Sequence, residues 1–217
     1  MSGALTLQDL RIHQGATPVV ALNLSVAPGE VLTIMGPSGS GKSTALSAIM
    51  GTLARAFRQQ GRVILDGRDI TALPPHQRRV GLLFQDDVLF PHLSVGANLA
   101  FALPPAVKGR AARRALVDAA LDQAELSGFA PRDPATLSGG QRARVALMRT
   151  LLAQPCALLL DEPFSRLDAS LRTQIRSFVL SRIRENGLAA ILVTHDAEDA
   201  HAAGGRVITP LGDPVTL

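Results

Sequence analysis

The most specific chemical motif of the sequence lies at residues 36–43. This segment reads Gly-Pro-Ser-Gly-Ser-Gly-Lys-Ser, matches the pattern G-x-x-x-x-G-K-[ST], and stands between an apolar run and a segment with helical periodicity. In such a turn, backbone N–H groups and the helix start point at phosphate oxygens, lysine neutralises them, and serine can bind Mg²⁺. A plain glycine-rich turn is the alternative. We therefore expect a triphosphate-binding loop made of Gly36, Pro37, Ser38, Gly39, Ser40, Gly41, Lys42, Ser43 and Thr44.

Polar side chains follow three other apolar runs. Asp161 and Glu162 come directly after Leu158–Leu160, Gln85 follows residues 80–84, and His195 follows residues 191–194. Beside a phosphate loop, Asp161 is expected to reach Mg²⁺ and Glu162 to polarise an attacking water. Taken alone, the acidic pair is typical of a solvated strand end, and a single histidine or glutamine indicates no function.

A second candidate anion site lies at residues 137–141, which read Leu-Ser-Gly-Gly-Gln and open a segment with helical periodicity. A Ser-Gly-Gly turn at a helix N-terminus exposes free backbone N–H groups and the positive end of the helix dipole. The alternative is that Ser138 only caps the helix and the glycines only add flexibility. The residues by themselves leave both interpretations open.

The elements that must position these groups can be inferred from the same apolar runs. Continuous runs at residues 31–35, 80–84, 158–160 and 191–194 are typical of buried parallel strands, whose carboxyl ends share one rim of a sheet. Residues 20–26 and 61–70 alternate between apolar and polar and predict half-buried antiparallel strands. Residues 88–136 predict a small helical insertion, and amphipathic helices are expected after Gly140 and after Asp168.

Composition excludes several classes of protein. The 217 residues are 47% hydrophobic and 18% charged, which indicates one globular domain over residues 1–217 with its own core. The single cysteine, Cys156, excludes an intramolecular disulfide, and no secretion signal or membrane span is expected. The net charge of +4 decides little. Aromatic residues make up 3% with no Trp or Tyr, so we expect no nucleic-acid partner.

These motifs together resemble the ATP-binding cassette family over almost the whole chain. The resemblance rests on residues 36–43, Gln85, Leu-Ser-Gly-Gly-Gln at 137–141, Ala157–Pro163 and His195. It implies an α/β fold: a P-loop NTPase (RecA-like) core with a mainly parallel sheet, an N-terminal antiparallel β subdomain and the helical insertion. It also implies ATP hydrolysis with Mg²⁺ in a head-to-tail homodimer that closes when ATP binds.

The resemblance further implies a role for individual residues. Glu162 would be the catalytic base and His195 would hold the γ-phosphate, while Gln85 would sense Mg²⁺ and the attacking water. Mg²⁺ would be held by Ser43, Gln85 and Asp161. ATP bound to one subunit would be contacted from the other by Ser138, Gly139, Gly140, Gln141 and Asp168. Asp168 is also a candidate N-cap for the helix that follows it.

Residues 84–99 resemble importer-type cassettes, such as those serving thiamine, iron, sulfate, polyamines or sugars. That resemblance implies uptake across the bacterial inner membrane, with the chain peripheral on the cytoplasmic face. The implied partners are integral membrane permease subunits and a periplasmic or surface substrate-binding protein. Phe90, Leu93 and Val95 are candidates for contacting the permease, or for the core of the insertion. The alternatives are an exporter or lipoprotein-release cassette and a soluble, non-transport cassette ATPase.

Two positions and the length of the chain after His195 depart from the family pattern. The family usually places an aromatic residue ahead of the phosphate loop to stack on adenine, whereas the first Phe here is Phe57 and His13 is the nearest substitute. Only 22 residues follow His195, which predicts that the regulatory barrel of some sugar-type cassettes is missing. Arg166 stands where a small residue is common.

Overall fold

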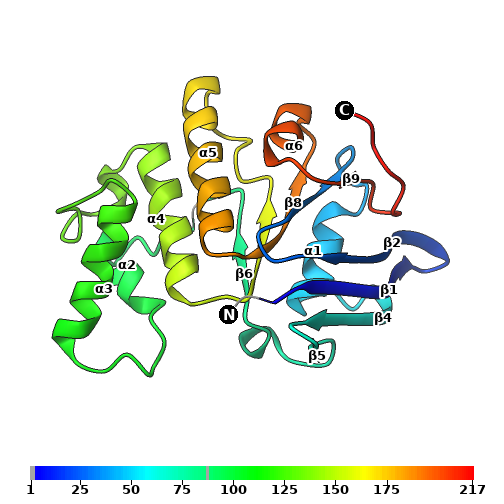
Figure 1. Ribbon diagram of the computed structural model, residues 1–217, viewed down its shortest axis with the longest axis horizontal. Coiled ribbons are helices and arrows are strands. Elements are labelled where there is room, and N and C mark those ends of the chain that lie inside the picture. The colour runs from blue at the N-terminus through cyan, green and yellow to red at the C-terminus, as the bar shows by residue number, and fades with distance from the viewer. Residues whose placement is uncertain (1–2, 87) are drawn as a thin grey trace. The chain divides into compact units, whose positions relative to one another are not determined.

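The computed structural model of the protein describes residues 3–86 and 88–217 (Figure 1). The chain divides into two compact units. The first comprises Met1–Leu82, Cys156–Glu162 and Leu180–Leu217, and the second comprises Leu83–Pro155 and Pro163–Val179. The α/β fold predicted from the sequence is confirmed, with one antiparallel sheet, one sheet of parallel pairs, and helices.

The antiparallel sheet has the strand order β2-β1-β4-β5. Its strands are β1 (Leu5–Gln14), β2 (Thr17–Val26), β4 (Phe57–Leu65) and β5 (Arg68–Asp69). In β1 and β2, alternate side chains are buried, including Leu10, Ile12, Val20 and Leu22. Because strand side chains alternate between faces, Arg11 and His13 lie on the opposite, open face of β1.

The second sheet has the order β6-β7-β8-β3-β9. It consists of β6 (Val80–Leu83), β7 (Ala157–Asp161), β8 (Ala189–Thr194), β3 (Val31–Met35) and β9 (Val207–Ile208). β8 pairs in parallel with both β7 and β3, so these strands end at the same rim. Their side chains are almost fully buried, as expected for continuous apolar runs in a parallel sheet.

Helix α1 (Lys42–Met50) begins directly after the predicted phosphate loop. Its C-terminal end is held by Arg78, a buried arginine that follows the short helix η1 (Pro75–Gln77). The Arg78 guanidinium donates to the carbonyls of Ala48 and Ile49 at 2.9 and 2.8 Å, and to those of Leu73 and Thr71 at 2.8 and 2.6 Å. Since terminal helix carbonyls otherwise lack partners, this arginine fixes the helix that carries Lys42 and Ser43. Helix α6 (Ala197–Ala203) also belongs to the first unit.

The second unit is mainly helical. It contains α2 (Val95–Phe101), α3 (Arg110–Gln123), η2 (Pro134–Thr136) and α4 (Gly139–Leu152), and α5 (Ala169–Glu185) begins in it. Its core is formed by the facing sides of these helices, including Leu99, Leu121 and Val145.

Val95 is fully buried in the core of the second unit. The prediction that it contacts a membrane subunit is therefore wrong, because its side chain fills the interior. Phe90 and Leu93 are only partly buried, and Phe90 stacks edge-on against Phe101 with ring centroids 4.9 Å apart. Phe101 is 69% exposed, so the apolar surface here includes a residue that the sequence pattern did not single out. Within residues 3–86 and 88–217, none of the helices has the length and apolar character that crossing a membrane requires.

Candidate functional site

The predicted phosphate loop connects β3 to α1 in the first unit. Gly41 has φ of 102° at the helix start, and a Cβ there would lie 2.6 Å from Val19 Cγ1. Only glycine suits both the left-handed backbone and the close approach to β2. The Lys42 side chain is buried, and its Nζ donates to the carbonyls of Gly36 and Pro37 at 2.8 and 2.9 Å. The ammonium group is thereby held over the loop.

Glu162 follows the last residue of β7 and adopts a left-handed backbone, with φ of 46°. Its N–H donates to the Val193 carbonyl of β8 at 3.0 Å, which anchors this conformation. Such a backbone costs free energy in a non-glycine residue and is concentrated at functional sites. Here it places the Glu162 carboxylate between two nitrogen-bearing side chains: Oε1 lies 3.6 Å from Lys42 Nζ, and Oε2 lies 3.0 Å from His195 Nδ1.

Asp161 lies beside the start of α1. Its Oδ1 accepts a hydrogen bond from Ser43 Oγ at 3.1 Å. Burial raises the pKa of Asp161 above its ordinary value because it disfavours the charged form, and the neighbouring Glu162 carboxylate adds to the rise. The Ser43 hydrogen bond and the Lys42 charge act in the opposite direction. A second positive charge at this point would favour the ionised carboxylate.

The pair of Ser43 and Asp161 suits a divalent cation that accompanies phosphate. Mg²⁺ prefers oxygen ligands and in nucleotide sites takes one or two protein oxygens, with phosphates and water completing its shell. A hydroxyl and a carboxylate 3.1 Å apart at the mouth of a phosphate loop provide such a pair. In the part of the chain that the structure describes, no group of three or more His, Cys, Asp and Glu side chains could hold a metal ion.

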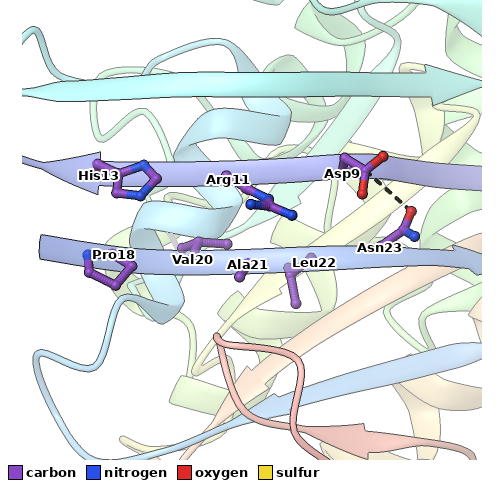
Figure 2. Close-up of a pocket in the computed structure, with 8 residues that line it drawn as sticks. All are labelled: Asp9, Arg11, His13, Pro18, Val20, Ala21, Leu22 and Asn23. Atoms are coloured by element: carbon purple, nitrogen blue, oxygen red, sulfur yellow. Dashed lines mark hydrogen bonds between the residues drawn. The ribbon is translucent and has the colours of Figure 1, made fainter.

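A cavity of about 210 Å³ lies on the open face of the antiparallel sheet (Figure 2). Figure 2 shows His13 and Pro18 at one end and Asp9 and Asn23 at the other, with Arg11 between them. Val19, which follows Pro18 in the chain, contacts the phosphate loop at Gly41. Pro18 and His13 line one end of the cavity, so this end is one residue along β2 from the contact with the loop. Arg11 is not among the predicted site residues, although its position two residues before His13 on a strand predicts a shared face.

The remaining predicted site residues lie in the second unit. Gln85 is exposed just after β6. Ser138 caps α4: its Oγ accepts from Gln141 N at 3.3 Å, and Gln141 Oε1 accepts from Ser138 N at 3.0 Å. This reciprocal cap is the alternative interpretation raised above, and it leaves Ser138 exposed at a helix N-terminus.

Asp168 begins α5 in a similar way. Its carboxylate accepts hydrogen bonds from Leu171 N at 3.0 Å and from Ser170 Oγ at 2.9 Å. These hydrogen bonds lower the pKa of Asp168, and the bond from the Leu171 N–H has the largest effect. The turn at Gly139 and Gly140 packs on this helix start, since a Cβ on Gly140 would lie 2.5 Å from Leu171 Cδ1.

Another contact in the second unit joins the loop after Gln85 to the loop before Asp168. Arg166 forms an ion pair with Asp86, and both border a cavity of about 500 Å³ together with Gln85 and Gly139. The unusual Arg166 is thus paired with a carboxylate that neighbours Gln85. Sequence inspection could not find this pair because the residues are 80 positions apart.

The chain is similar in sequence to known proteins. The family model described as "ABC transporter" matches residues 19–165. An uncharacterised ABC transporter ATP-binding protein of Escherichia coli, YnjD, is 52% identical over 83% of this chain and 83% of its own length. The thiamine import ATP-binding protein ThiQ of Cereibacter sphaeroides is 43% identical over 94% of this chain and 87% of its own. The spermidine/putrescine import ATP-binding protein PotA of Frankia alni is 44% identical over 96% of this chain, which spans only 44% of that relative.

Proposed function

The chain belongs to the ABC transporter family as an ATP-binding subunit of the importer type, and we propose that Glu162 is the general base of its ATPase reaction. The observation that carries this proposal is the convergence of Lys42, Glu162 and His195 beside the phosphate loop, with contacts of 3.6 and 3.0 Å. These three groups come from different elements, and a catalytic role accounts for the left-handed backbone of Glu162.

The chemistry that we assign to these residues is in-line hydrolysis. A water oxygen forms a bond to the γ-phosphorus, the bond from that phosphorus to the β–γ bridging oxygen breaks, and its electron pair leaves with ADP. Glu162 accepts the proton of the water, and Lys42 and His195 stabilise the charge on the transferring phosphoryl group. Mg²⁺, held by Ser43, Asp161 and Gln85, would neutralise charge on the β- and γ-phosphates.

We further propose that two copies of the chain close on ATP. Ser138, Gly139, Gly140 and Gln141 open α4; the capping box engages the N–H groups of Ser138 and Gln141, and the helix dipole at this end favours an anion. In the proposed homodimer this turn meets the triphosphate held by the other copy, and Asp168 lies at the same interface. Exposure of both Ser138 and Asp168 supports this arrangement.

The proposed partners are a membrane permease and an external substrate-binding protein, with uptake as the direction of transport. Two of the relatives named above are import proteins, for thiamine and for spermidine and putrescine. The exposed Phe101, its neighbour Phe90 and the exposed Val88 offer an apolar surface for the permease. The chain would then lie on the cytoplasmic face of the inner membrane.

A Glu162→Gln variant tests the central assignment. It removes the base but keeps the size of the side chain, so hydrolysis should fall by about 10²-fold or more while ATP binding is retained. Because ATP is bound but not cleared, this variant should accumulate as a dimer in size-exclusion chromatography. Glu185→Gln, at an exposed position paired with Arg182, is the matched control and should leave hydrolysis unchanged. Undiminished hydrolysis by Glu162→Gln would exclude the proposed role.

A further inference from the structure

The cavity on the open face of the antiparallel sheet contains a row of three polar side chains from one strand. Asp9, Arg11 and His13 all border it from β1 (Figure 2). On the neighbouring strand β2, Pro18 pairs with His13 and Ala21 pairs with Arg11. The small side chain of Ala21 leaves room over which the Arg11 side chain extends, and Arg11 is exposed.

This row lies where the base of a bound nucleotide would be placed. Val19 contacts Gly41 of the phosphate loop. Pro18, which precedes Val19 in the chain, pairs with His13, and these two residues line one end of the cavity. A base stacked on His13 would therefore have an edge, rather than a face, directed along β1 toward Arg11. This placement rests on the proposed function, in which the loop holds the triphosphate.

A contact to the edge of the base should affect base selectivity more here than it would beside a large aromatic side chain. The chain has no Trp or Tyr, and imidazole offers a smaller stacking surface than either. Stacking is also tolerant of base identity, because every base has a π-face. Selectivity must then come from groups that meet the base edge, and Arg11 is the long donor side chain in the row.

A guanidinium distinguishes the two purines by their acceptors. Guanine presents O6 and N7, two acceptors that match arginine in a bidentate contact, whereas adenine presents N7 beside an amino donor. We propose that Arg11 is a specificity-determining residue which lets this site accept guanosine triphosphate as well as adenosine triphosphate. The other charged groups facing the row are Asp9, two residues before Arg11, and Arg58, which pairs with His13 across β1 and β4.

The test is calorimetric titration of AMP-PNP and GMP-PNP, which are not hydrolysed, into the full chain with Mg²⁺. For the wild type we expect dissociation constants within about tenfold of one another. Arg11→Ala should weaken GMP-PNP by at least about fivefold, the lower end of what one bidentate base contact contributes, and AMP-PNP by less than about twofold. Arg11→Lys should give an intermediate loss because a lysine cannot make the paired contact.

Control variants separate this inference from the proposed function. Arg62→Ala removes an exposed arginine of β4 that lies outside the cavity and should change neither constant. Lys42→Ala should abolish binding of both analogues. One outcome would overturn the role of Arg11 and leave the triphosphate site intact. In it, Lys42→Ala binds neither analogue, while Arg11→Ala keeps the wild-type ratio of the two dissociation constants. Failure of the wild type to bind either analogue would instead overturn the proposed function, and strong exclusion of GMP-PNP by the wild type would overturn only the inference about guanine.

Discussion

His195 Nδ1 lies 3.0 Å from Glu162 Oε2, although 32 residues separate the two in the chain. The contact exists because β7 and β8 are parallel neighbours and end at the same rim, so the residue after each strand faces the other. The opposite carboxylate oxygen of Glu162 faces Lys42 at 3.6 Å. One carboxylate thus contacts both of the side chains, Lys42 and His195, that we assign to the γ-phosphate.

This relationship predicts the effect of removing the imidazole. His195→Ala should reduce kcat by about 10²–10³-fold, the range observed when one charge-stabilising donor is removed from a transition state. KM for ATP should change little, since Lys42 and the loop amides still bind the ground state. The measurement is steady-state hydrolysis, with His201→Ala, an exposed histidine of α6, as the control. A kcat within about threefold of wild type would show that His195 does not act on the reacting phosphate.

We predict that the Asp161 carboxylate lowers the stability of the protein at neutral pH although hydrolysis requires it. Its pKa is raised in the folded state, so the folded protein binds more protons than the unfolded chain at pH values between the ordinary 3.8 and the raised value. The free energy of unfolding therefore falls as pH rises through that window and stays lower at neutral pH. Asp161→Asn removes the titrating group and should have an equal or higher Tm at pH 7 without nucleotide or Mg²⁺.

The Asp161→Asn advantage in Tm should shrink as the pH is lowered through the raised pKa of Asp161, because wild-type Asp161 then becomes protonated itself. Mg²⁺-dependent hydrolysis should be lost at every pH, because the substitution removes the carboxylate charge that we assign to binding the cation. Thermal unfolding from pH 4 to pH 8 checks this prediction, with the exposed Asp118→Asn as the control. A variant that is less stable than wild type at pH 7 would contradict the burial cost assigned to Asp161.

The two adjacent glycines of the 137–141 turn should respond differently to a methyl group. Gly140→Ala places Cβ 2.5 Å from Leu171 Cδ1, whereas the nearest atom to a Cβ on Gly139 is 3.9 Å away. Gly140→Ala should lower the free energy of unfolding by about 1–3 kcal/mol relative to Gly139→Ala, as expected for overpacking. Chemical denaturation measures the difference.

A second substitution tests the cause of that difference. Leu171→Ala removes the obstructing atoms, so Gly140→Ala should cost less in the Leu171→Ala background than in wild type. Such non-additivity is expected only for residues in contact. Equal costs in the two backgrounds would mean that Leu171 is not the obstacle.

A site shared between two copies predicts complementation. Lys42→Ala disables the phosphate loop and Ser138→Arg disables the turn that we place opposite it, so each homodimer is inactive. A mixed dimer carries one interface with both wild-type residues and should hydrolyse ATP. Hydrolysis is measured after mixing the purified variants, with subunit exchange confirmed by two different affinity tags. Exchange without recovered activity would indicate a site contained within one chain.

The apolar surface around Phe101 should be needed for membrane recruitment. Phe101→Ser removes a side chain that is 69% exposed and packs on Phe90, so it should lower the amount of permease that co-purifies with tagged protein from solubilised membranes. Hydrolysis by the isolated protein should be unchanged. Leu116→Ser, at a 41% exposed position of α3, is the control. Equal recovery of membrane protein with both variants would exclude Phe101 from the docking surface.

The sequence by itself determined the chemistry and the class of fold. The phosphate loop, the acidic pair at 161–162 and the turn at 137–141 are contiguous motifs, and their function depends on local backbone geometry that neighbouring residues specify. The continuous apolar runs at 31–35, 158–160 and 191–194 likewise predicted the buried strands that became β3, β7 and β8. Periodicity of this kind depends only on nearby residues, so it can be recognised in the chain.

The tertiary structure alone decided which of these groups meet and which face outward. Strand order is a property of long-range pairing, so the contact between Glu162 and His195 and the left-handed φ of Glu162 could not be predicted from the apolar runs. Val95 and Phe101 are both apolar residues of α2, yet packing against the neighbouring helices buries the first and exposes the second. The place of Arg11 in the cavity was decided in the same way, because the pairing of β1 with β2 set it opposite the small Ala21.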